Sequence, residues 1–367
     1  MNSSQYQICS RCVMDVSDED IQFDEQKVCN HCKEFEITLN KVKSIQGIWS
    51  NTAEIIKKAG RGKKYDCLIG ISGGVDSCYT AYLAKKAGLR PLLFHMDNGW
   101  NSENSVRNIK KVVDKLDVDY TSVVLDWEEF KEIQLAFLKS SIVDIEMPTD
   151  IAILAAAYKT ARKHGIKYIL SGGNYCGEGI LPLTWGYHVM KDVKLYRHIV
   201  RTYGNTPIKK VPLVGLTDEI RYKFIHGIKT IYPLNKIDYD KDAAKAFLKR
   251  EYDWTDYGGK HHESRITAFW QSYAMPTKYN MDYRRATCSS LIVSGQMSRE
   301  DALELLKGLP YKEESIKQDK EYVAKKFGIS VEELNQILEL LPKTYKDFPN
   351  AKITIDWFYR VYRKIFN

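Results

Sequence analysis

Short apolar runs alternate with amphipathic segments through the first half of the chain. The apolar runs, which predict strands, are residues 65–71, 91–96, 121–125 and 168–171. The amphipathic segments, which predict helices, are residues 78–87, 103–116 and 150–163. This alternation predicts an α/β fold with a doubly wound parallel sheet, in which ligands bind beyond the carboxyl ends of the strands.

The pattern changes on both sides of this region. Residues 33–58 are polar with helical spacing, and a basic stretch at 60–64 indicates a boundary. Beyond Ser290 the chain reads as an α-helical region, with helix starts expected at Ser298 and Ser330. We therefore expect three parts: a head and helical linker at 1–59, a nucleotide-binding domain at 60–240, and a substrate loop with a helical domain at 241–367. The aromatic and basic end, 357–366, is expected to dock on the core, with dimerisation or contact with a membrane surface as alternatives.

Four of the eight cysteines form two pairs, Cys9 with Cys12 and Cys29 with Cys32, separated by sixteen residues. This spacing is typical of a zinc ribbon, in which four thiolates hold one tetrahedral ion. Because protein would fill all four coordination positions, we expect structural Zn²⁺. Two disulfides are the alternative, which a cytoplasmic protein disfavours. We expect that location because no secretory leader is visible and the longest apolar run, about eight residues, is too short to span a bilayer.

The amino-acid composition excludes only a few classes of function. A hydrophobic fraction of 44% excludes a disordered chain, and 55 basic against 47 acidic residues give a net charge of +8. This excess suits nucleotides, sugar nucleotides, tRNA or an anionic membrane about equally.

A glycine-rich turn follows the first predicted strand and opens a helix. Such a turn lets the backbone approach an anion, and the amides that begin the helix suit a phosphate. The Walker A and G-x-G-x-x-G patterns are both absent. The residues predicted to cradle a polyphosphate are Ser72, Gly73, Gly74, Val75, Asp76 and Ser77.

Polar strings at the other strand ends should meet this cradle in one crevice, because parallel strands end at the same edge. They lie at 95–100, 149–150 and 171–174. Asp76 and Asp150 are the carboxylates best placed to hold Mg²⁺. Asp150 can instead be a helix cap.

These strings carry a resemblance. The string Ser-Gly-Gly-Val-Asp-Ser resembles the PP-loop of the ATP pyrophosphatases, a HUP-like fold. Residues 95–103, 171–174, 178–182 and 254–264, with the four-cysteine head, are similar to the N-acetyl sugar amidotransferase family over essentially the whole chain. The resemblance implies an ATP-dependent ligase of bacterial surface-polysaccharide synthesis, such as lipopolysaccharide O-antigen or pseudaminic acid. It would convert an acetamido group of a sugar nucleotide or nonulosonic acid into an acetamidino group, releasing AMP and pyrophosphate.

The resemblance also implies roles for individual residues. Those expected to complete the ATP site are His95, Asp97, Thr149, Asp150, Gly172 and Gly173. Those expected to bind the sugar are Asn98, Trp100, Asn174, Glu178, Trp254, Tyr257, Gly258 and Gly259. Those expected to act in catalysis are Asp76, Lys260, His261, His262 and Glu263. A second metal site at His261 and Glu263, or a solvated loop without function, remains open.

No internal glutaminase is visible, because the chain has neither a cysteine at position 2 nor a G-x-C-x-G elbow. The resemblance implies that a separate glutaminase and a barrel-type subunit deliver ammonia. A PP-loop tRNA-modifying enzyme with a zinc-ribbon head is the main alternative, although no basic stripe indicates nucleic acid. A non-enzymatic zinc-ribbon adaptor is a second alternative.

Overall fold

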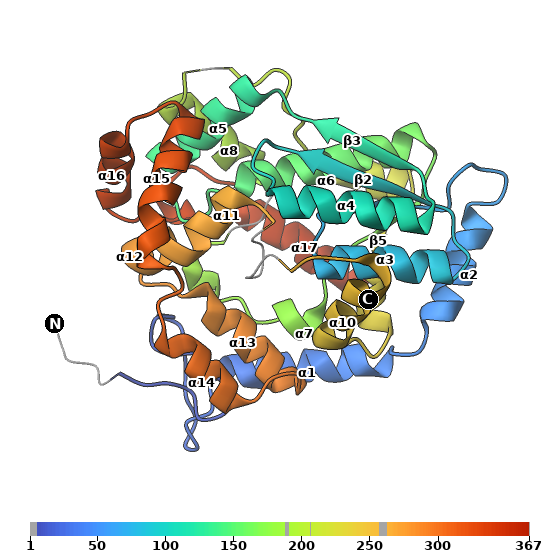
Figure 1. The fold of residues 1–367 in the computed structure, drawn as a ribbon, viewed down its shortest axis with the longest axis horizontal. Coiled ribbons are helices and arrows are strands. Elements are labelled where there is room, and N and C mark those ends of the chain that lie inside the picture. The colour runs from blue at the N-terminus through green and yellow to red at the C-terminus, as the bar shows by residue number, and fades with distance from the viewer. Residues whose placement is uncertain (1–5, 188–190, 206, 257–262, 367) are drawn as a thin grey trace.

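A five-stranded parallel sheet forms the centre of the computed structural model, which describes residues 6–187, 191–205, 207–256 and 263–366, with side chains up to Tyr362. The strand order is β3-β2-β1-β4-β5 (Figure 1). The strands are β1 (Cys67–Gly70), β2 (Pro91–Asp97), β3 (Tyr120–Val124), β4 (Tyr168–Leu170) and β5 (Lys229–Ile231). The predicted doubly wound α/β fold is confirmed. The fifth strand was missed, because three partly exposed residues give no apolar run.

Helices cover both faces of the sheet, because its strands alternate their side chains between two cores. In β1, Leu68 packs into one core, whereas Cys67 and Ile69 pack into the other. The helices on the Cys67 side are α2 (Trp49–Ala59), α3 (Val75–Lys86), α4 (Glu103–Leu116) and α10 (Lys241–Tyr252). Those on the Leu68 side are α5 (Trp127–Lys139), α6 (Met147–Lys163) and α8 (Val193–Tyr203).

Two helices begin earlier than predicted. Helix α3 starts at Val75, so the glycine-rich turn leads directly into its first turn. Helix α6 starts at Met147 after the N-cap Glu146, which places Asp150 inside the first turn. The alternative that Asp150 caps this helix is therefore wrong.

Short elements connect β4 to α10. They are α7 (Tyr175–Glu178), η1 (Leu183–Trp185), α9 (Leu216–Ile220), η2 (Arg221–Ile225) and η3 (Pro233–Lys236). The C-terminal region is helical, as predicted. Its elements are α11 (Arg265–Phe269), η4 (Trp270–Ala274), α12 (Met275–Tyr279), α13 (Tyr283–Ser294), α14 (Arg299–Lys307), α15 (Glu313–Phe327), α16 (Val331–Glu339), η5 (Tyr345–Asp347) and α17 (Lys352–Phe366). The expected helix starts are confirmed, because the hydroxyls of Ser298 and Ser330 accept hydrogen bonds from the first turns of α14 and α16.

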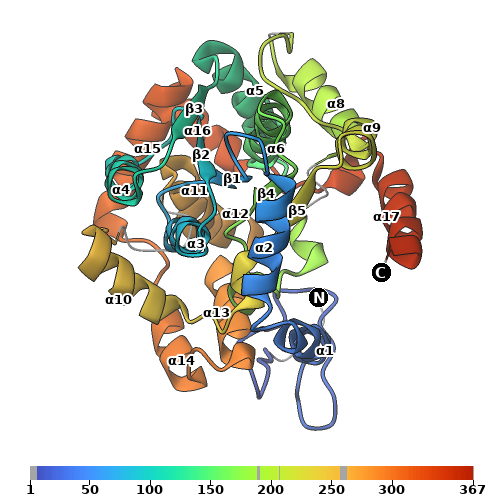
Figure 2. The same ribbon diagram turned by 90° about the vertical axis from the view of Figure 1, so that its right-hand side faces the viewer.

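The last helix docks on the domain, as expected. The hydroxyl of Tyr359 on α17 donates a hydrogen bond to Glu219 of α9, and the ring of Tyr362 packs against Phe224. Figure 2 shows α17 beside α9 at the edge of the molecule. No helix in the described part of the chain is long and apolar enough to cross a bilayer.

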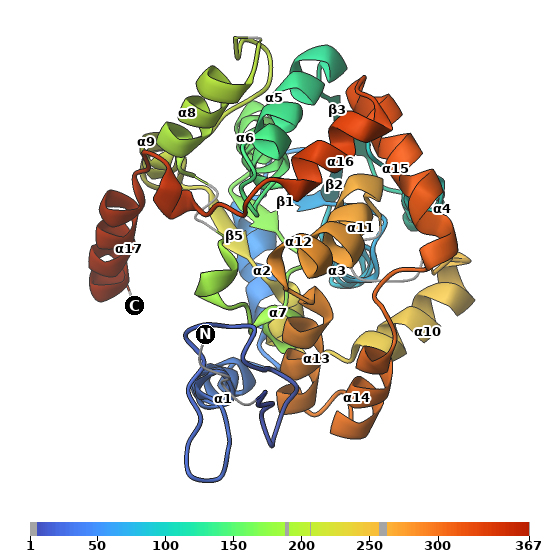
Figure 3. The same ribbon diagram turned by 90° about the vertical axis from the view of Figure 1, so that its left-hand side faces the viewer.

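The N-terminal head, which ends in α1 (Asn30–Ser44), packs against the C-terminal helices (Figure 3). The Val13 amide donates to the Ser289 hydroxyl at 3.2 Å, and the Arg285 guanidinium lies 3.0 Å from the Asp15 carboxylate. Ser289 and Arg285 both belong to α13. The head is therefore joined to the C-terminal helical region by direct contacts.

Candidate functional site

The glycine-rich turn at residues 72–77 is held by its own serines. The hydroxyl of Ser77 donates to the Gly74 carbonyl at 3.0 Å and accepts from the Ser72 amide at 3.2 Å. The Gly74 amide donates to the Ser72 hydroxyl, also at 3.2 Å. These bonds fix the backbone at the N-terminus of α3, where helix amides and the helix dipole favour an anion.

The glycines of this turn are required by close packing. Gly73 has φ +85°, and a Cβ atom placed on it would lie 2.3 Å from the Ser105 carbonyl oxygen. A Cβ on Gly172, at the end of β4, would lie 2.8 Å from the Ser77 amide nitrogen. The turn is therefore packed between the start of α4 and the loop after β4, with no room for a side chain at Gly73 or Gly172.

Asp76 faces two side chains that sequence reasoning missed. The Tyr239 hydroxyl donates a hydrogen bond to its carboxylate, and the Lys241 ammonium lies 3.7 Å from its other oxygen. Burial and the adjacent Asp76 carboxylate raise the pKa of Tyr239, so its proton is retained. Asp76 suits Mg²⁺, because its side chain is 21% exposed, its ion pair is long, and this ion needs few carboxylates beside phosphates.

The loop after β2 is supported from within. His95 is buried, its Nδ1 lies 2.9 Å from the Ile71 carbonyl oxygen, and its Nε2 lies 3.1 Å from the Asn101 amide. Burial lowers the pKa of His95, which favours the neutral ring. The Asp97 carboxylate accepts hydrogen bonds from the Gly99 and Asn101 nitrogens, both at 2.9 Å. A contact of either His95 nitrogen with adenosine would require breaking one of these bonds, so its predicted role stays a prediction.

The start of α6 brings two carboxyl groups to the same edge of the sheet. The Asn98 amide lies 3.4 Å from the Thr149 hydroxyl, which ties the start of α6 to the end of β2. Burial raises the pKa of Asp150 to about 6 and, with the nearby Asp150 charge, that of Glu146 to about 8. One oxygen of Glu146 accepts from Thr267 at 3.0 Å, while the other has no hydrogen-bond partner among the described residues. Glu146 was missed because a single glutamate before a helix carries no signal.

The loop after β4 lies against the glycine-rich turn. Gly173 donates its amide to the Ser171 hydroxyl at 3.2 Å, and the Asn174 side chain accepts from the Gly177 amide at 2.9 Å. Asn174 is buried as the cap of α7, whereas Glu178, at the end of that helix, is exposed. The predicted roles of both residues on the sugar stay predictions.

Both tryptophans predicted to bind the sugar are structural in this arrangement. Trp100 is 0% exposed, and its indole donates to Gln134 at 2.6 Å within the core. Trp254 is 4% exposed, and its indole donates to the Gly73 carbonyl at 2.8 Å. The predictions are wrong for these side chains, because folding uses their apolar surface: Trp100 fills a core and Trp254 supports the glycine-rich turn.

The polar segment before α11 lies only in part within the described residues. Tyr257, Gly258, Gly259, Lys260, His261 and His262 lie outside them, so their predicted roles stay predictions. Glu263 is described. Its carbonyl accepts hydrogen bonds from the Ser102 amide at 2.8 Å and the Ser105 hydroxyl at 3.3 Å. Since Gly73 also packs against Ser105, the structure brings Glu263 beside the glycine-rich turn.

The four thiols of the head surround a space of the size of one metal ion. The Sγ atoms of Cys9 and Cys32 are 3.8 Å apart, and Cys29 Sγ lies 3.7 Å from those of Cys12 and Cys32. All four sulfurs lie within 4.8 Å of one another. A tetrahedral Zn²⁺ with Zn–S bonds of about 2.3 Å places its sulfurs about 3.8 Å apart. The cysteines therefore fit this ion.

The surroundings of the thiols also favour a cation. Backbone amides of Arg11, Cys12 and Cys29 lie 3.3–3.4 Å from Cys9 Sγ, which stabilises a thiolate. Hydrogen bonds from neighbouring thiols lower the pKa of Cys9, whereas the nearby Cys12 sulfur raises the pKa of Cys32. All four thiols would ionise together only with a positive ion between them.

The alternatives fit less well. The cysteines are free thiols, so the disulfide alternative is contradicted. In an iron–sulfur cluster the thiolates bind different iron atoms. The cysteine sulfur atoms then lie farther apart than they do when all four bind one ion. A single tetrahedral metal ion is therefore what the arrangement of the four thiols suits best.

Two family models match the chain, and the first of them contains the glycine-rich turn. The model described as NAD synthase matches residues 48–157, and the model described as LPS biosynthesis protein WbpG-like, C-terminal domain, matches residues 263–364. The chain thus has a PP-loop domain of the NAD synthase type at residues 48–157 and a WbpG-like C-terminal domain at residues 263–364. The glycine-rich turn is its PP-loop, and the WbpG-like domain begins at Glu263 beside that loop.

Solved structures similar to this PP-loop protein share little sequence with it. The NH₃-dependent NAD synthetase of Campylobacter jejuni is 15% identical, with a TM-score of 0.36 over 70% of this chain and 94% of that one. NMN synthetase of Francisella tularensis is 15% identical, with a TM-score of 0.29 over 68% and 96%. The U34-tRNA thiolase NcsA of Methanococcus maripaludis, which has a [4Fe-4S] cluster, is 13% identical, with a TM-score of 0.35 over 82% and 88%. Comparison with curated proteins finds no significant match.

The family models confirm the coarser part of the expectation. The PP-loop domain and the WbpG-like domain indicate an ATP-utilising enzyme of lipopolysaccharide biosynthesis.

The first prediction concerns the cysteine site. Cys29→Ser should lose the metal and unfold at a much lower temperature, because structural zinc contributes about 10–16 kcal/mol to small zinc domains. Cys67→Ser, which alters another fully buried cysteine, should keep one zinc per chain. Metal analysis by mass spectrometry with thermal unfolding measures both. Iron with acid-labile sulfide in the wild type, or a metal-free and equally stable Cys29→Ser, would contradict the assignment.

The second prediction concerns the PP-loop backbone. Gly73→Ala should weaken binding of a non-hydrolysable ATP analogue at least about tenfold, because the new methyl group meets the Ser105 carbonyl. Gly295→Ala is the matched control: its φ is +84°, but nothing lies within 4 Å of its Cβ position. Calorimetric titration distinguishes them, and equal effects would show that backbone strain alone matters.

The third prediction concerns Glu146. With a folded pKa of about 8 against an ordinary 4.5, the native state holds a proton that the unfolded chain releases. Stability should therefore fall as pH rises from about 4.5 to about 8, by up to about 1.4 kcal/mol per unit. Glu146→Gln should lack this loss of stability. Its melting temperature relative to that of the wild type should therefore rise as the pH increases from about 5 to about 8.5.

The control for this experiment is Glu128→Gln, which removes the same charge from a side chain that is 77% exposed. Its melting curve should follow that of the wild type across the range. If Glu146→Gln did the same, the carboxyl would not be protonated in the native state.

Proposed function

We propose that this protein is an ATP-dependent amidotransferase that converts an acetamido group of an acidic sugar into an acetamidino group. The observation that carries the proposal is the position of Glu263, where the WbpG-like domain starts, against the same Ser105 on which the PP-loop packs. A sugar held by that domain would meet ATP at the PP-loop. The lipopolysaccharide assignment of the domain supports a sugar as the second substrate.

The reaction balances without a redox partner. The amide oxygen attacks the α-phosphorus of ATP, and the bond to pyrophosphate breaks. Ammonia then attacks the amide carbon, the carbon–oxygen bond breaks, and AMP leaves with the former amide oxygen. Ammonia loses one proton, so the product forms as an amidinium that carries an NH₂⁺ group in place of that oxygen.

The chain's own groups suit each part of this sequence. The PP-loop amides, fixed by Ser72 and Ser77, would hold the departing pyrophosphate, and Asp76 would hold Mg²⁺, which supplies charge neutralisation on the phosphates. Glu146 is the described carboxyl suited to proton transfer, because its pKa of about 8 lies near neutral pH. Lys260, His261 and His262 are proposed, as before, to contact the sugar or move a proton.

The source of ammonia and the role of Zn²⁺ are part of the same proposal. A glutaminase with a barrel-type subunit would supply ammonia, and free ammonium should replace it at high concentration. Zn²⁺ would keep the cysteine head folded and take no part in the reaction, because its four positions are filled by Cys9, Cys12, Cys29 and Cys32. We place the enzyme in the cytoplasm, where ATP is available.

The two alternative functions, a tRNA-modifying enzyme and a non-enzymatic adaptor, require other structural features than an amidotransferase does. A tRNA-modifying enzyme of the thiolating kind needs a reactive cysteine at the ATP site, yet burial raises the pKa of Cys78, beside the PP-loop, to about 12. A non-enzymatic adaptor would not need the close packing at Gly73. Neither rival is favoured by a contact in the described residues.

The fourth prediction tests the reaction. With an acetamido sugar, Mg²⁺ and ammonium chloride, the protein should release AMP and pyrophosphate in equal amounts and form an amidine. Asp76→Asn should slow this by about 10²–10³-fold, because a metal carboxylate is lost. Glu103→Gln, an 87% exposed carboxylate on the neighbouring α4, is the control and should stay fully active.

Nucleotide chromatography and mass spectrometry of the sugar measure both products. Formation of ADP and phosphate would exclude the mechanism. Copurifying tRNA that is modified in place of the sugar would establish the rival function.

A further inference from the structure

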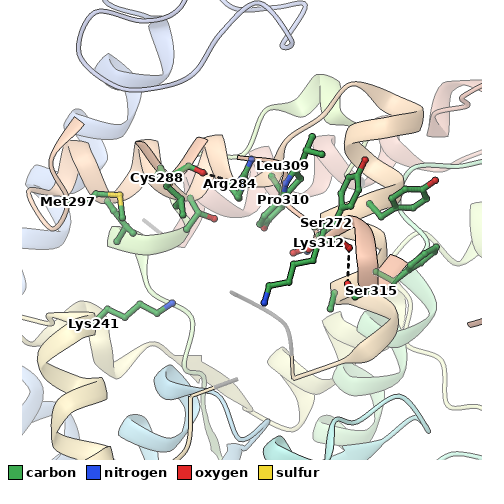
Figure 4. A pocket seen from close by; sticks show the side chains of 18 of the residues that line it. Lys241, Ser272, Arg284, Cys288, Met297, Leu309, Pro310, Lys312 and Ser315 are labelled. Carbon is green, nitrogen blue, oxygen red and sulfur yellow. Dashed lines mark hydrogen bonds between the residues drawn. The ribbon is translucent and has the colours of Figure 1, made fainter. Parts of the chain in front are cut away.

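A large pocket lies between α10 of the PP-loop domain and the helices of the WbpG-like domain (Figure 4). Its volume is about 850 Å³, near the upper end of pockets that hold small molecules. The walls come from the start of α10, from α11 and η4, from α13, and from the segment joining α14 to α15. None of the described residues that we predicted to bind the sugar lines it.

The charges in the pocket leave two cations for a ligand. Five basic and three acidic side chains line it: Lys241, Lys245, Arg265, Arg284 and Lys312, with Asp240, Asp242 and Asp319. Most are bound within the protein. Arg284 contacts Asp282 and the Leu305 and Gly308 carbonyls, and Arg265 lies over the ring of Tyr322.

Lys241 and Lys312 differ from the others. Figure 4 shows both side chains extending into the space between α10 and the C-terminal helices. Within the described residues, Lys312 has no carboxylate at ion-pairing distance, and Lys241 has only the long contact of 3.7 Å to Asp76. The pocket therefore presents two ammonium groups to whatever enters it.

One wall is aromatic. The rings of Phe269 and Tyr273 are 5.6 Å apart, and Tyr311 meets Tyr273 edge to face at 5.1 Å. Rings beside cations suit a ligand with a flat or weakly polar face and a separate negative charge. Sugars that carry a carboxylate or a phosphate have both properties.

We propose that this pocket binds the acidic acetamido sugar, with its negative group held by Lys241 and Lys312 and its ring on the wall of Phe269, Tyr273 and Tyr311. The proposal rests on the proposed function and adds the binding site of the second substrate. Lys241 joins this site to the ATP site, because its ammonium contacts Asp76. When Asp76 turns to the Mg²⁺ of bound ATP, Lys241 is released to the sugar, so nucleotide should strengthen sugar binding.

The fifth prediction tests the pocket on the full chain. Binding of two probes, UDP-N-acetylglucosamine and N-acetylneuraminic acid, is measured by calorimetry with and without a non-hydrolysable ATP analogue and Mg²⁺. At least one probe should bind, more tightly with the analogue. The diphosphate probe alone would identify a phosphate site, and the carboxylate probe alone would identify a carboxylate site.

Charge variants distinguish a direct contact in the pocket from a general effect of protein charge on ligand binding. Lys312→Glu should weaken the bound probe at least about tenfold, because an attractive contact becomes repulsive, while Lys312→Arg should stay within about threefold. Lys317→Glu makes the same charge change on an exposed residue of α15 outside the pocket and should have little effect. ATP-analogue affinity should be unchanged in all three variants.

The outcomes distinguish this proposal from the proposed reaction. Binding of neither probe, or equal effects of Lys312→Glu and Lys317→Glu, would overturn the pocket assignment. If a probe binds as described and yields neither AMP nor amidine, the pocket stands and the proposed reaction fails. If amidine forms on a probe and Lys312→Glu leaves its KM unchanged, the reaction stands and the pocket fails.

Discussion

The packing of Gly73 against Ser105 is the constraint on which the candidate site depends. A residue larger than glycine would collide with the Ser105 carbonyl, so the PP-loop can take its position only with a bare backbone. The same serine bonds through its hydroxyl to the Glu263 carbonyl, and Ser102 adds a second bond to that carbonyl. One backbone contact thus fixes three segments: the phosphate-binding turn, the start of α4 and the first residue of the WbpG-like domain.

The four-cysteine head stabilises the other side of the same domain. Ala286 and Ser289 of α13 face the head, whereas Arg284, Thr287 and Leu291 line the pocket. These two sets follow the spacing of opposite helix faces. A single ion at the head would therefore help to hold α13, and with it one wall of the pocket. Arg299 strengthens the link by donating to the carbonyls of Cys9 and Cys12.

The sequence was informative wherever the signal is local. Strand-turn-helix alternation identified four of the five strands, and the cysteine spacing identified the thiol cluster, because both depend on neighbours along the chain. The roles of Trp100 and Trp254 could not be derived in this way. An indole beside a polar string reads equally well as a sugar platform or as core, and only the tertiary fold decides between them.

The same limit explains the residues that were missed. Tyr239 contacts Asp76 across 163 positions, and Thr267 meets Glu146 across 121. No periodicity or spacing encodes such pairs, since each side chain lies in an ordinary helical or loop context. The pocket was missed for a related reason: its lining residues are scattered from 240 to 319 and converge only when α10 packs against the C-terminal helices.

The arrangement of charge accounts for how two anions can meet in one site. ATP and an acidic sugar repel each other, and the carboxyl groups of Asp150 and Glu146 would add to this repulsion if ionised. Burial raises the pKa of Glu146 to about 8, so at neutral pH this carboxyl is mostly uncharged, while Lys241 and Lys312 line the pocket. In the proposed complex Lys241 would balance the charge of Asp76 before nucleotide binds and that of the sugar afterwards. In the proposed complex, the cost of bringing two anions together would be reduced by Lys241 and by Glu146, which keeps its proton at neutral pH.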